Sequence, residues 1–244
     1  MPSSKTFPSS KFPSGQTRSP ESQLSLAVTK AAAIRSPCFF VAVLLLVAAA
    51  AVAQAIPEEH LTSTPKSTVA YQPITGRQRF HWFLKSTIGP QGLTAGLFSA
   101  GFGTAINRPT EYGPHWSGFG KRYAMRLTGI STGNAMEAGF GALWGEDPRY
   151  FRAATGQSFK GRLKHVAMMT FVARQADGSF APAYARYIGT VGNNFLSNTW
   201  RADSESGLND ACIRILLGFA GRMGSDAFAE FWPDARKHIL PWKH

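Results

Sequence analysis

Cysteine is nearly absent from this chain of 244 residues, and its histidines form no recognisable metal motif. The only cysteines are Cys38 and Cys212, which excludes a disulfide framework and a zinc site built from clustered cysteines. No pair of the six histidines has metal-ligand spacing, so we predict no metal site. The chain also lacks a P-loop, a dinucleotide fingerprint and a zinc finger, which predicts no cofactor and no specific nucleic-acid binding.

Acidic residues are scarce as well. Fourteen Asp and Glu stand against 26 Lys and Arg, for a formal net charge of +12. Such an excess favours anionic partners, among them phospholipid head groups and acidic envelope polymers. Removing residues 1–55 takes away five basic residues and one acid, so the charge of +12 falls to +8 and the remainder stays basic.

One long apolar run, Cys38 to Ala53, follows the basic residues Lys30 and Arg35. A positive segment, an apolar block and small residues at the cut define a secretory signal, and cleavage is predicted after Ala53 or Ala55. This interpretation places the protein in the periplasm or at the outer membrane. The alternative is a single-pass inner-membrane anchor, which also leaves the C-terminal domain outside the cytoplasm because the basic residues precede the run.

Composition divides the chain into four parts. We predict a disordered n-region or a mis-assigned start at 1–36, the apolar and cleavage regions of a signal peptide at 37–55, a proline-rich linker at 56–76, and a Gly-rich helical domain at 77–244. Cleavage would leave Cys212 alone, so no intramolecular disulfide is expected in the cleaved chain.

The domain is predicted to be all-α, a Gly-rich bundle of about five helices. Apolar residues recur at helical spacing, and Gly or Pro marks the ends. The expected helices run from Arg77 to Ile88, about Gly120 to Trp144, Phe159 to a point before Asp177, about Tyr184 to Trp200, and Leu208 towards Phe231, where Pro233 is expected to break the last one. An apolar stretch of small residues, Gly92 to Ile106, follows the first helix.

Glycines four residues apart recur in these helices. The pairs are Gly92/Gly96, Gly129/Gly133 and Gly141/Gly145. They indicate either close approach of helix backbones or glycines that cap helices and occupy loops.

A small outer-membrane β-barrel is the alternative architecture. Large and small residues alternate from Leu97 to Ile106, as in a barrel wall. The alternation does not continue through 159–174 or 208–223, so the helical class is favoured.

The sequence Gly129-Ile-Ser131-Thr-Gly133 matches the nucleophile elbow of serine hydrolases. Asp203, Asp210 or Asp226, followed by His238, would complete a triad in the order Ser, Asp, His. The elbow needs a buried strand before the serine, but the preceding residues are cationic and amphipathic. We therefore regard Ser131 and His238 as weak catalytic candidates.

The densest charged cluster begins at Glu146 and Asp147 and includes Arg149 and Arg152. Two carboxylates beside two arginines indicate an acid/base pair with an anion clamp. The structural alternative, which we favour, is a turn in which Asp147 caps a following helix and Arg149 pairs with an acid.

Two predicted helix starts carry cations interleaved with aromatic residues. They are candidates for gripping phosphates or lying on a lipid surface, and the alternative is a solvated helix face. The residues are Lys121, Arg122 and Arg126 in the first, and Lys160, Arg162 and Lys164 in the second.

Four short segments complete the pattern. They are Gly118-Phe-Gly-Lys-Arg-Tyr, Glu146-Asp-Pro-Arg-Tyr-Phe-Arg, Ser197-Asn-Thr-Trp and Glu230-Phe-Trp-Pro-Asp. With them, the stretch from Arg77 to Leu240 resembles an uncharacterised family of signal-peptide-bearing, Gly-rich bacterial envelope proteins. The resemblance implies an exported, helical, envelope-associated domain and supplies no activity and no catalytic residues.

We therefore expect an exported, envelope-associated, non-enzymatic protein that contacts a membrane or an anionic envelope polymer. The alternative is a hydrolase of a lipid or anionic envelope substrate that uses Ser131 or the Glu146/Asp147 pair. The sequence indicates no oligomeric state.

Overall fold

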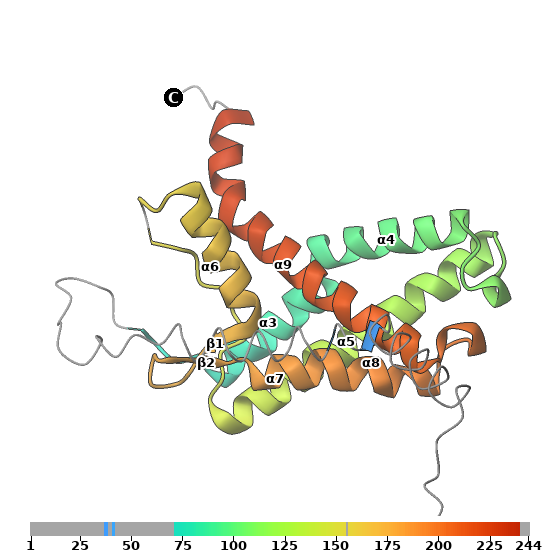
Figure 1. The fold of residues 1–244 in the computed structure, drawn as a ribbon, viewed down its shortest axis with the longest axis horizontal. Coiled ribbons are helices and arrows are strands. Elements are labelled where there is room, and N and C mark those ends of the chain that lie inside the picture. The colour runs from blue at the N-terminus through green and yellow to red at the C-terminus, as the bar shows by residue number, and fades with distance from the viewer. Residues whose placement is uncertain (1–36, 39–40, 42–70, 155, 240–244) are drawn as a thin grey trace, which may run out of the picture.

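The computed structural model describes residues 37–38, 41, 71–154 and 156–239, and helices dominate them (Figure 1). The predicted helical class is confirmed, with five long helices and one two-stranded sheet among the described residues. The predicted cleavage positions Ala53 and Ala55 lie outside these residues. The elements are α3 (Gly76–Ile88), α4 (Pro90–Ala105), η2 (Thr110–Tyr112), α5 (Trp116–Trp144), α6 (Phe159–Phe171), β1 (Val172–Arg174), β2 (Phe180–Pro182), α7 (Tyr184–Tyr187), η3 (Ile188–Gly192), α8 (Asn193–Leu196), η4 (Ser197–Thr199), η5 (Asp203–Glu205) and α9 (Leu208–Ile239).

Local capping signals set several of these boundaries. Thr75 begins α3 with a capping box, because its hydroxyl accepts from the Gln78 N–H while the Gln78 side chain accepts from the Thr75 N–H. Gly89 then ends α3, and Pro90 takes the first position of α4, where a missing N–H is tolerated. The Ser158 hydroxyl caps α6 in the same way as Thr75 caps α3.

Glycines hold several helices close together, although not all of them serve this purpose. Gly96 of α4 faces Tyr123 of α5, and a Cβ there would lie 2.9 Å from the Tyr123 ring. Gly133 of α5 meets Gly189 of η3, where a Cβ on Gly189 would lie 2.8 Å from the Gly133 carbonyl oxygen. Gly145, in contrast, ends α5 in a left-handed conformation with φ 80°. Both predicted uses of glycine therefore occur.

The predicted helix from Tyr184 to Trp200 is not regular. A π-helical turn, η3, separates α7 from α8, and a 3-10 turn, η4, follows. After the π turn, Asn193 lies against α5, and its side-chain amide donates to the Gly129 carbonyl at 2.9 Å. Gly and β-branched residues in η3 favour α-helix weakly, which fits the irregular turn.

A short β-hairpin after α6 was not predicted. Strand β1 pairs antiparallel with β2, and Ala173 lies opposite Ala181. The connecting turn uses Gly178 at φ 87°, while Asp177 accepts from the Ser179 N–H. Asp-Gly is a strong turn signal between strands, but strands of three residues are too short to show an alternating pattern.

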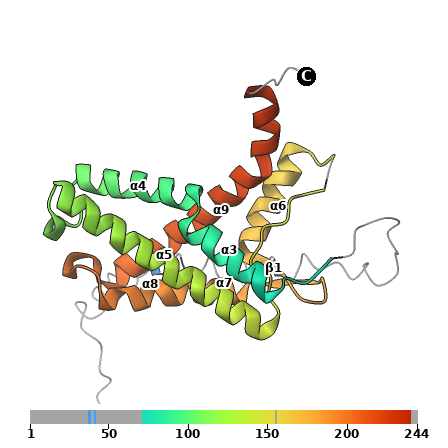
Figure 2. The same cartoon turned by 180° about the vertical axis from the view of Figure 1, so that it is seen from behind.

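Helix α9 continues through Pro233 to Ile239, so the predicted break is wrong. A proline inside a helix removes a backbone donor and distorts the preceding turn. Here arginine side chains supply donors in that turn, because Arg152 and Arg162 donate to the Glu230 carbonyl oxygen at 2.9 and 2.6 Å. Figures 1 and 2 show α9 bending in its C-terminal part.

A small apolar cluster lies at the other end of α9. Ile215 and Phe219 are buried there beside Val41 and Cys212. Cys38 forms a disulfide with Cys212. The expected absence of an intramolecular disulfide assumed cleavage, and it does not hold for the full chain.

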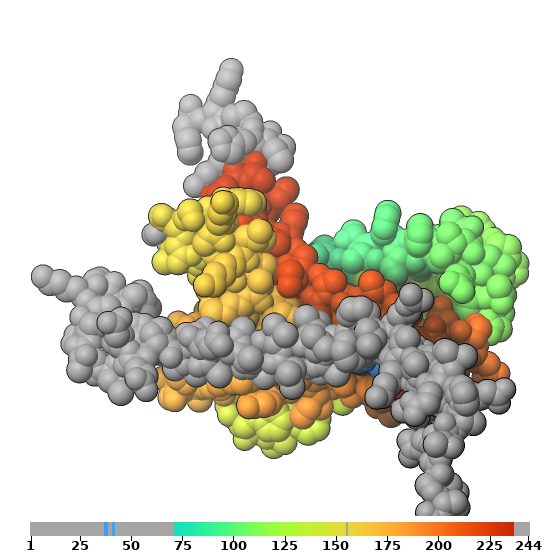
Figure 3. Space-filling view, in the orientation of Figure 1, coloured from blue at the N-terminus to red at the C-terminus, as the bar shows by residue number. Residues whose placement is uncertain are grey.

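Helix α4 lies at the edge of the molecule, and Figure 3 shows its outer side uncovered by any other described element. Its sequence contains no charged residue. None of the helices in the described part of the chain combines the length and apolar character that a bilayer crossing needs.

Candidate functional site

A large cleft separates α9 from the α4–α5 pair. Its volume is about 1320 Å³, and its walls come from α4, α5, the α7–α8 segment and α9. Figure 1 shows α4 and α9 diverging in front of α5. Where they converge, the Gln91 side-chain amide donates to the Ser225 hydroxyl at 3.1 Å. The cleft stays open because α9 packs mainly on α6 and α8.

Four charged side chains meet on one side of the cleft, and we call them the ionic floor: the buried Glu137, Arg186 and Asp226, and the partly buried Arg222. Arg186 and Arg222 both bond to the Glu137 carboxylate, at 3.1 and 3.3 Å. Arg222 also lies 3.6 Å from Asp226 and donates to the Pro148 carbonyl at 2.8 Å. The ionic floor thereby ties α5, α7, α9 and the segment after α5 together.

Burial and neighbouring charges together determine the pKa values of the ionic floor. Burial raises the pKa of Asp226, and the positive charges of Arg222 and Arg186 only partly offset it. Burial and the neighbouring Arg222 charge lower the pKa of Arg186. For Arg222, burial alone would lower the pKa, but the carboxylates of Glu137 and Asp226 outweigh it and raise the pKa. The arginines remain charged, so their role here is to bind carboxylates.

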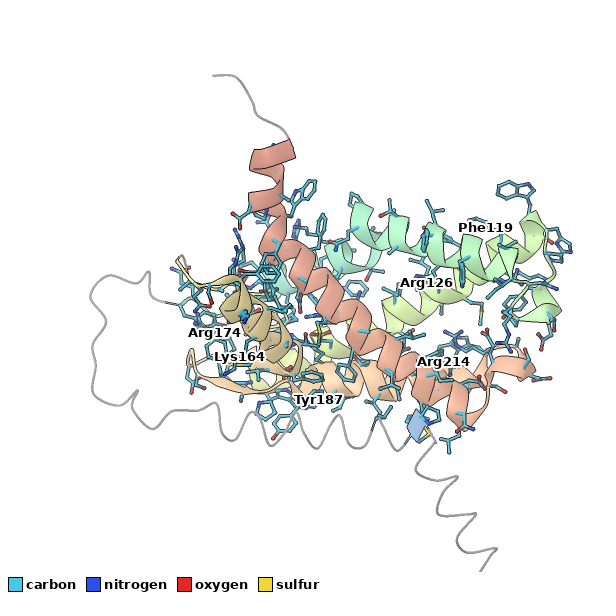
Figure 4. All side chains as sticks on the ribbon, turned by 45° about the horizontal axis from the view of Figure 1, so that its top comes forward. Phe119, Arg126, Lys164, Arg174, Tyr187 and Arg214 are labelled. Atoms are coloured by element: carbon cyan, nitrogen blue, oxygen red, sulfur yellow. A yellow bond between two sulfur atoms is a disulfide. The ribbon has the colours of Figure 1, made fainter. Side chains whose placement is uncertain are left out.

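Six other arginines line the cleft, and we call three of them the arginine end: Arg126, Arg201 and Arg214. Figure 4 shows Arg126 on the α5 wall and Arg214 on the α9 wall. Arg126 donates to the Ser99 hydroxyl at 3.2 Å, and burial lowers its pKa. Arg214 donates to the carbonyls of Glu205 and Asn194 and to the Asn198 side chain.

Several polar atoms at the arginine end are buried without a hydrogen-bond partner among the described residues. They are Nε of Arg126, Nε of Arg214 and Oδ1 of Asn193. Buried polar atoms are nearly always hydrogen-bonded in proteins, so a group of them indicates a site for water, an ion or a ligand.

The charged cluster after α5 has a structural geometry. Asp147 is fully buried and binds the Arg149 guanidinium through both carboxylate oxygens, the shortest contact being 2.6 Å. The Tyr71 hydroxyl, within the predicted linker, also donates to Asp147 at 3.0 Å. The predicted Arg149–acid pair is present, but Asp147 caps no helix because the chain stays non-helical through the described residues up to Ser158.

Glu146 is directed into the interior beside Asp147. Its Oε2 accepts from the Trp144 indole N–H at 3.1 Å and from the Ala185 N–H at 3.0 Å, while Oε1 has no partner in the described part of the molecule. Glu146 is only 1% exposed. Because the carboxylate is enclosed, an acid/base role toward a substrate has no geometric support.

A second ionic node joins α6 to α9. Glu230, also 1% exposed, accepts from Arg162 at 2.7 Å, from the Tyr150 hydroxyl at 2.9 Å and from the Ala153 N–H at 3.1 Å. Burial would raise the pKa of Glu230, but these donors outweigh burial and lower it. Arg162 also pairs with Asp234 at 2.6 Å.

The six predicted anion-binding residues do not form one surface. Arg122 is buried, and its guanidinium donates to the carbonyls of Arg108, Pro109 and Gly113 at 2.7, 2.8 and 2.7 Å, so it holds the loop before α5. Arg162 is bound to the second ionic node. The remaining three apart from Arg126 are exposed: Lys121, Lys160 and Lys164. Of the predicted set, Arg126 alone lines the cleft without serving an internal network.

The elbow prediction finds no supporting geometry. Ser131 lies within α5, with helix on both sides and no strand before it. His238 belongs to the last turns of α9, and its side chain lies outside the described structure. Within the described residues, no group of His, Cys, Asp and Glu is arranged to hold a metal ion.

Sequence reasoning missed Arg201 and Arg214 and the ionic floor. Glu137 and Arg222 are 85 residues apart, and no spacing in the sequence joins them. The available signal was the presence of arginine within the apolar pattern of α9, where Arg214 and Arg222 interrupt the stripe.

The sequence matches no family model, no curated protein and no solved structure.

Proposed function

We propose that this is an exported, envelope-associated, non-enzymatic protein that attaches to an anionic bilayer through the outer face of α4. The supporting observation is that α4 carries no charged residue, yet Leu97 is 50% exposed and Phe98 is 79% exposed. Large apolar side chains are normally buried, so the part of α4 that exposes Leu97 and Phe98 lacks a covering partner among the described residues.

The surroundings of α4 suit a lipid interface. Lys85 lies exposed near the end of α3, Arg108 follows α4, and Lys121 is exposed near the start of α5. Trp116, at the start of α5, is 85% exposed. Exposed aromatic side chains with nearby cations are typical of segments that lie in the interface of an anionic membrane.

The test is flotation of the full-length protein with vesicles, comparing wild type with Leu97→Ser/Phe98→Ser. Loss of two apolar anchors should weaken partitioning into phosphatidylglycerol-containing vesicles by about tenfold or more. Leu143→Ser is the matched control, because Leu143 is 78% exposed at the other end of α5. It should bind as wild type does, and high salt or vesicles of phosphatidylcholine alone should reduce binding of both.

Two results would overturn the proposal. If the double variant floats as wild type does, membrane binding belongs to another segment, such as the apolar run Cys38 to Ala53. If a soluble acidic polysaccharide displaces the protein from vesicles and binds wild type and double variant equally, the partner is an anionic polymer.

A further inference from the structure

The arginine end of the cleft holds positive charge that the carboxylates of the described residues neutralise only in part. No carboxylate among the described residues lies within ion-pair distance of Arg126 or Arg214, and Arg201 has one contact with Glu205, at 3.5 Å. Nine Lys and Arg line the whole cleft against four Asp and Glu. In the ionic floor two arginines match two carboxylates, whereas at the arginine end three arginines face the two carboxylates of Glu205 and Asp210, so one positive charge is left over there.

Arg201 lies near both Arg214 and α5, the helix that carries Arg126. The Nη2 atom of Arg201 lies 3.9 Å from the position that a Cβ on Gly129 would occupy, and Gly129 is one helical turn after Arg126. The charge of Arg201 adds to burial in lowering the pKa of Arg214. Like charges gathered in a partly buried space repel one another, and a bound anion would relieve that repulsion.

The wall of the cleft next to this charge is apolar. Phe102 and Ile106 line it from α4 and are 61% and 50% exposed, and Ile213 and Leu217 line it from α9 and are 46% and 65% exposed. Inorganic phosphate would leave these side chains in water. A ligand that joins an anionic group to a hydrocarbon chain would cover both regions at once.

We propose that the cleft binds one anionic lipid molecule, with its acidic head group at Arg126, Arg201 and Arg214 and its acyl chain between α4 and α9. Guanidinium groups bind phosphate and carboxylate oxygens through paired N–H donors. The buried Nε atoms of Arg126 and Arg214, which have no partner in the described residues, are donors of this kind. The cleft, at about 1320 Å³, exceeds the roughly 300–1,000 Å³ of ordinary small-molecule pockets.

The experiment is calorimetric titration of the full-length protein with lysophosphatidic acid below its critical micelle concentration. Inorganic phosphate and the choline-headed lysolipid of equal chain length are titrated in parallel. We expect a single site for lysophosphatidic acid, with the choline lipid at least about tenfold weaker because its head group has no net charge, and free phosphate weaker still.

Variants locate the site. Arg126→Gln should weaken lysophosphatidic acid by roughly tenfold to a hundredfold, the range expected for one charged hydrogen-bonding group. Lys121→Gln removes an exposed cation from the same helix outside the cleft and should change affinity by less than about twofold. Leu217→Ser should weaken the lipid by about tenfold but leave phosphate unchanged.

Three results would overturn the inference. Equal affinity for phosphate and lysophosphatidic acid would mean a simple ion site, and equal affinity for the choline lipid would mean that head-group charge is irrelevant. Unchanged binding by Arg126→Gln would place the lipid elsewhere. The wild-type ligand series decides the first two even if a variant fails to fold.

The lipid site is separate from the proposed membrane face, because neither Leu97 nor Phe98 lines the cleft. Failure of the two proposals can therefore be distinguished. Arg126→Gln should still float with vesicles, and Leu97→Ser/Phe98→Ser should still bind monomeric lysophosphatidic acid.

Discussion

At the ionic floor, Arg186 and Arg222 share the carboxylate of Glu137, whereas at the arginine end Arg126 bonds, within the described part of the chain, to the Ser99 hydroxyl alone. Both sets of arginines are largely removed from solvent and line the same cleft. The paired arginines connect helices that are distant in sequence. Arg126, in contrast, makes one weak contact with the neighbouring α4.

Paired and unpaired arginines are expected to differ in what they contribute to folding and to ligand binding. Burying a charge is unfavourable unless it is paired, so paired arginines contribute to the fold only as long as their carboxylates remain. An unpaired arginine contributes little to stability and keeps its donors for an external anion. Three predictions test this division, from the largest expected effect to the smallest.

Glu230→Ala should lower the free energy of unfolding by about 3–5 kcal/mol, because it leaves Arg162 and the Tyr150 hydroxyl without their buried acceptor. Urea denaturation monitored by circular dichroism measures the change. Glu205→Ala, which breaks the more exposed pair with Arg201, is the control and should cost about 0–1 kcal/mol. Equal losses in the two variants would contradict the division.

Lowering the pH should change the contributions of the two buried carboxylates of α9 to the free energy of unfolding in opposite directions. The pKa of Glu230 is lowered from 4.5, so its stabilising contribution is present above that value and is lost as the pH falls through the folded-state pKa. The pKa of Asp226 is raised from 3.8, so its contribution increases as the pH falls through the folded-state pKa.

The measurement is the free energy of unfolding between about pH 3 and pH 6 for wild type, Glu230→Gln and Asp226→Asn. Glu230→Gln should flatten the loss of stability in acid, and Asp226→Asn should make that loss steeper. Parallel curves for the three proteins would show that neither carboxylate has the assigned environment.

Arg126→Leu should change the free energy of unfolding by no more than about 0.5 kcal/mol, or raise it, because it removes a desolvated charge without a carboxylate partner. Arg186→Leu is the matched variant at the ionic floor and should cost about 3 kcal/mol or more, since it leaves Glu137 less well paired. If both variants are equally unstable, Arg126 belongs to the structural set and the arginine end loses its distinction.

The helical architecture followed from local signals in the sequence. The predicted helix end at Ile88 and the predicted helix start at Phe159 depend on signals that act within one helical turn, and the structure confirms both boundaries. Pro233 misled the prediction for the opposite reason. Arg152 and Arg162, which come from segments far away in the sequence, bind the Glu230 carbonyl in the turn before Pro233, and α9 continues with a bend.

The site was less predictable because its chemistry depends on distant pairing. Arg122 and Arg126 occupy the same predicted cationic face, yet Arg122 is bound by three carbonyls and Arg126 is not. No residue close to them in the sequence distinguishes Arg122 from Arg126. The geometry also reassigns Asp147 from a helix cap to the partner of Arg149.

The bond between Cys38 and Cys212 restricts membrane topology. Cys38 is the first residue of the apolar run and Cys212 lies beyond its end, so a molecule that carries this bond has both ends of the run on one side of any membrane. If the run acts as a signal or anchor, the positive charges of Lys30 and Arg35 keep its start, with Cys38, on the cytoplasmic side. The C-terminal domain is then on the other side of the membrane. A chain with the Cys38–Cys212 disulfide therefore cannot also have the apolar run inserted across a membrane. Whether the two cysteines are oxidised or reduced distinguishes the two forms.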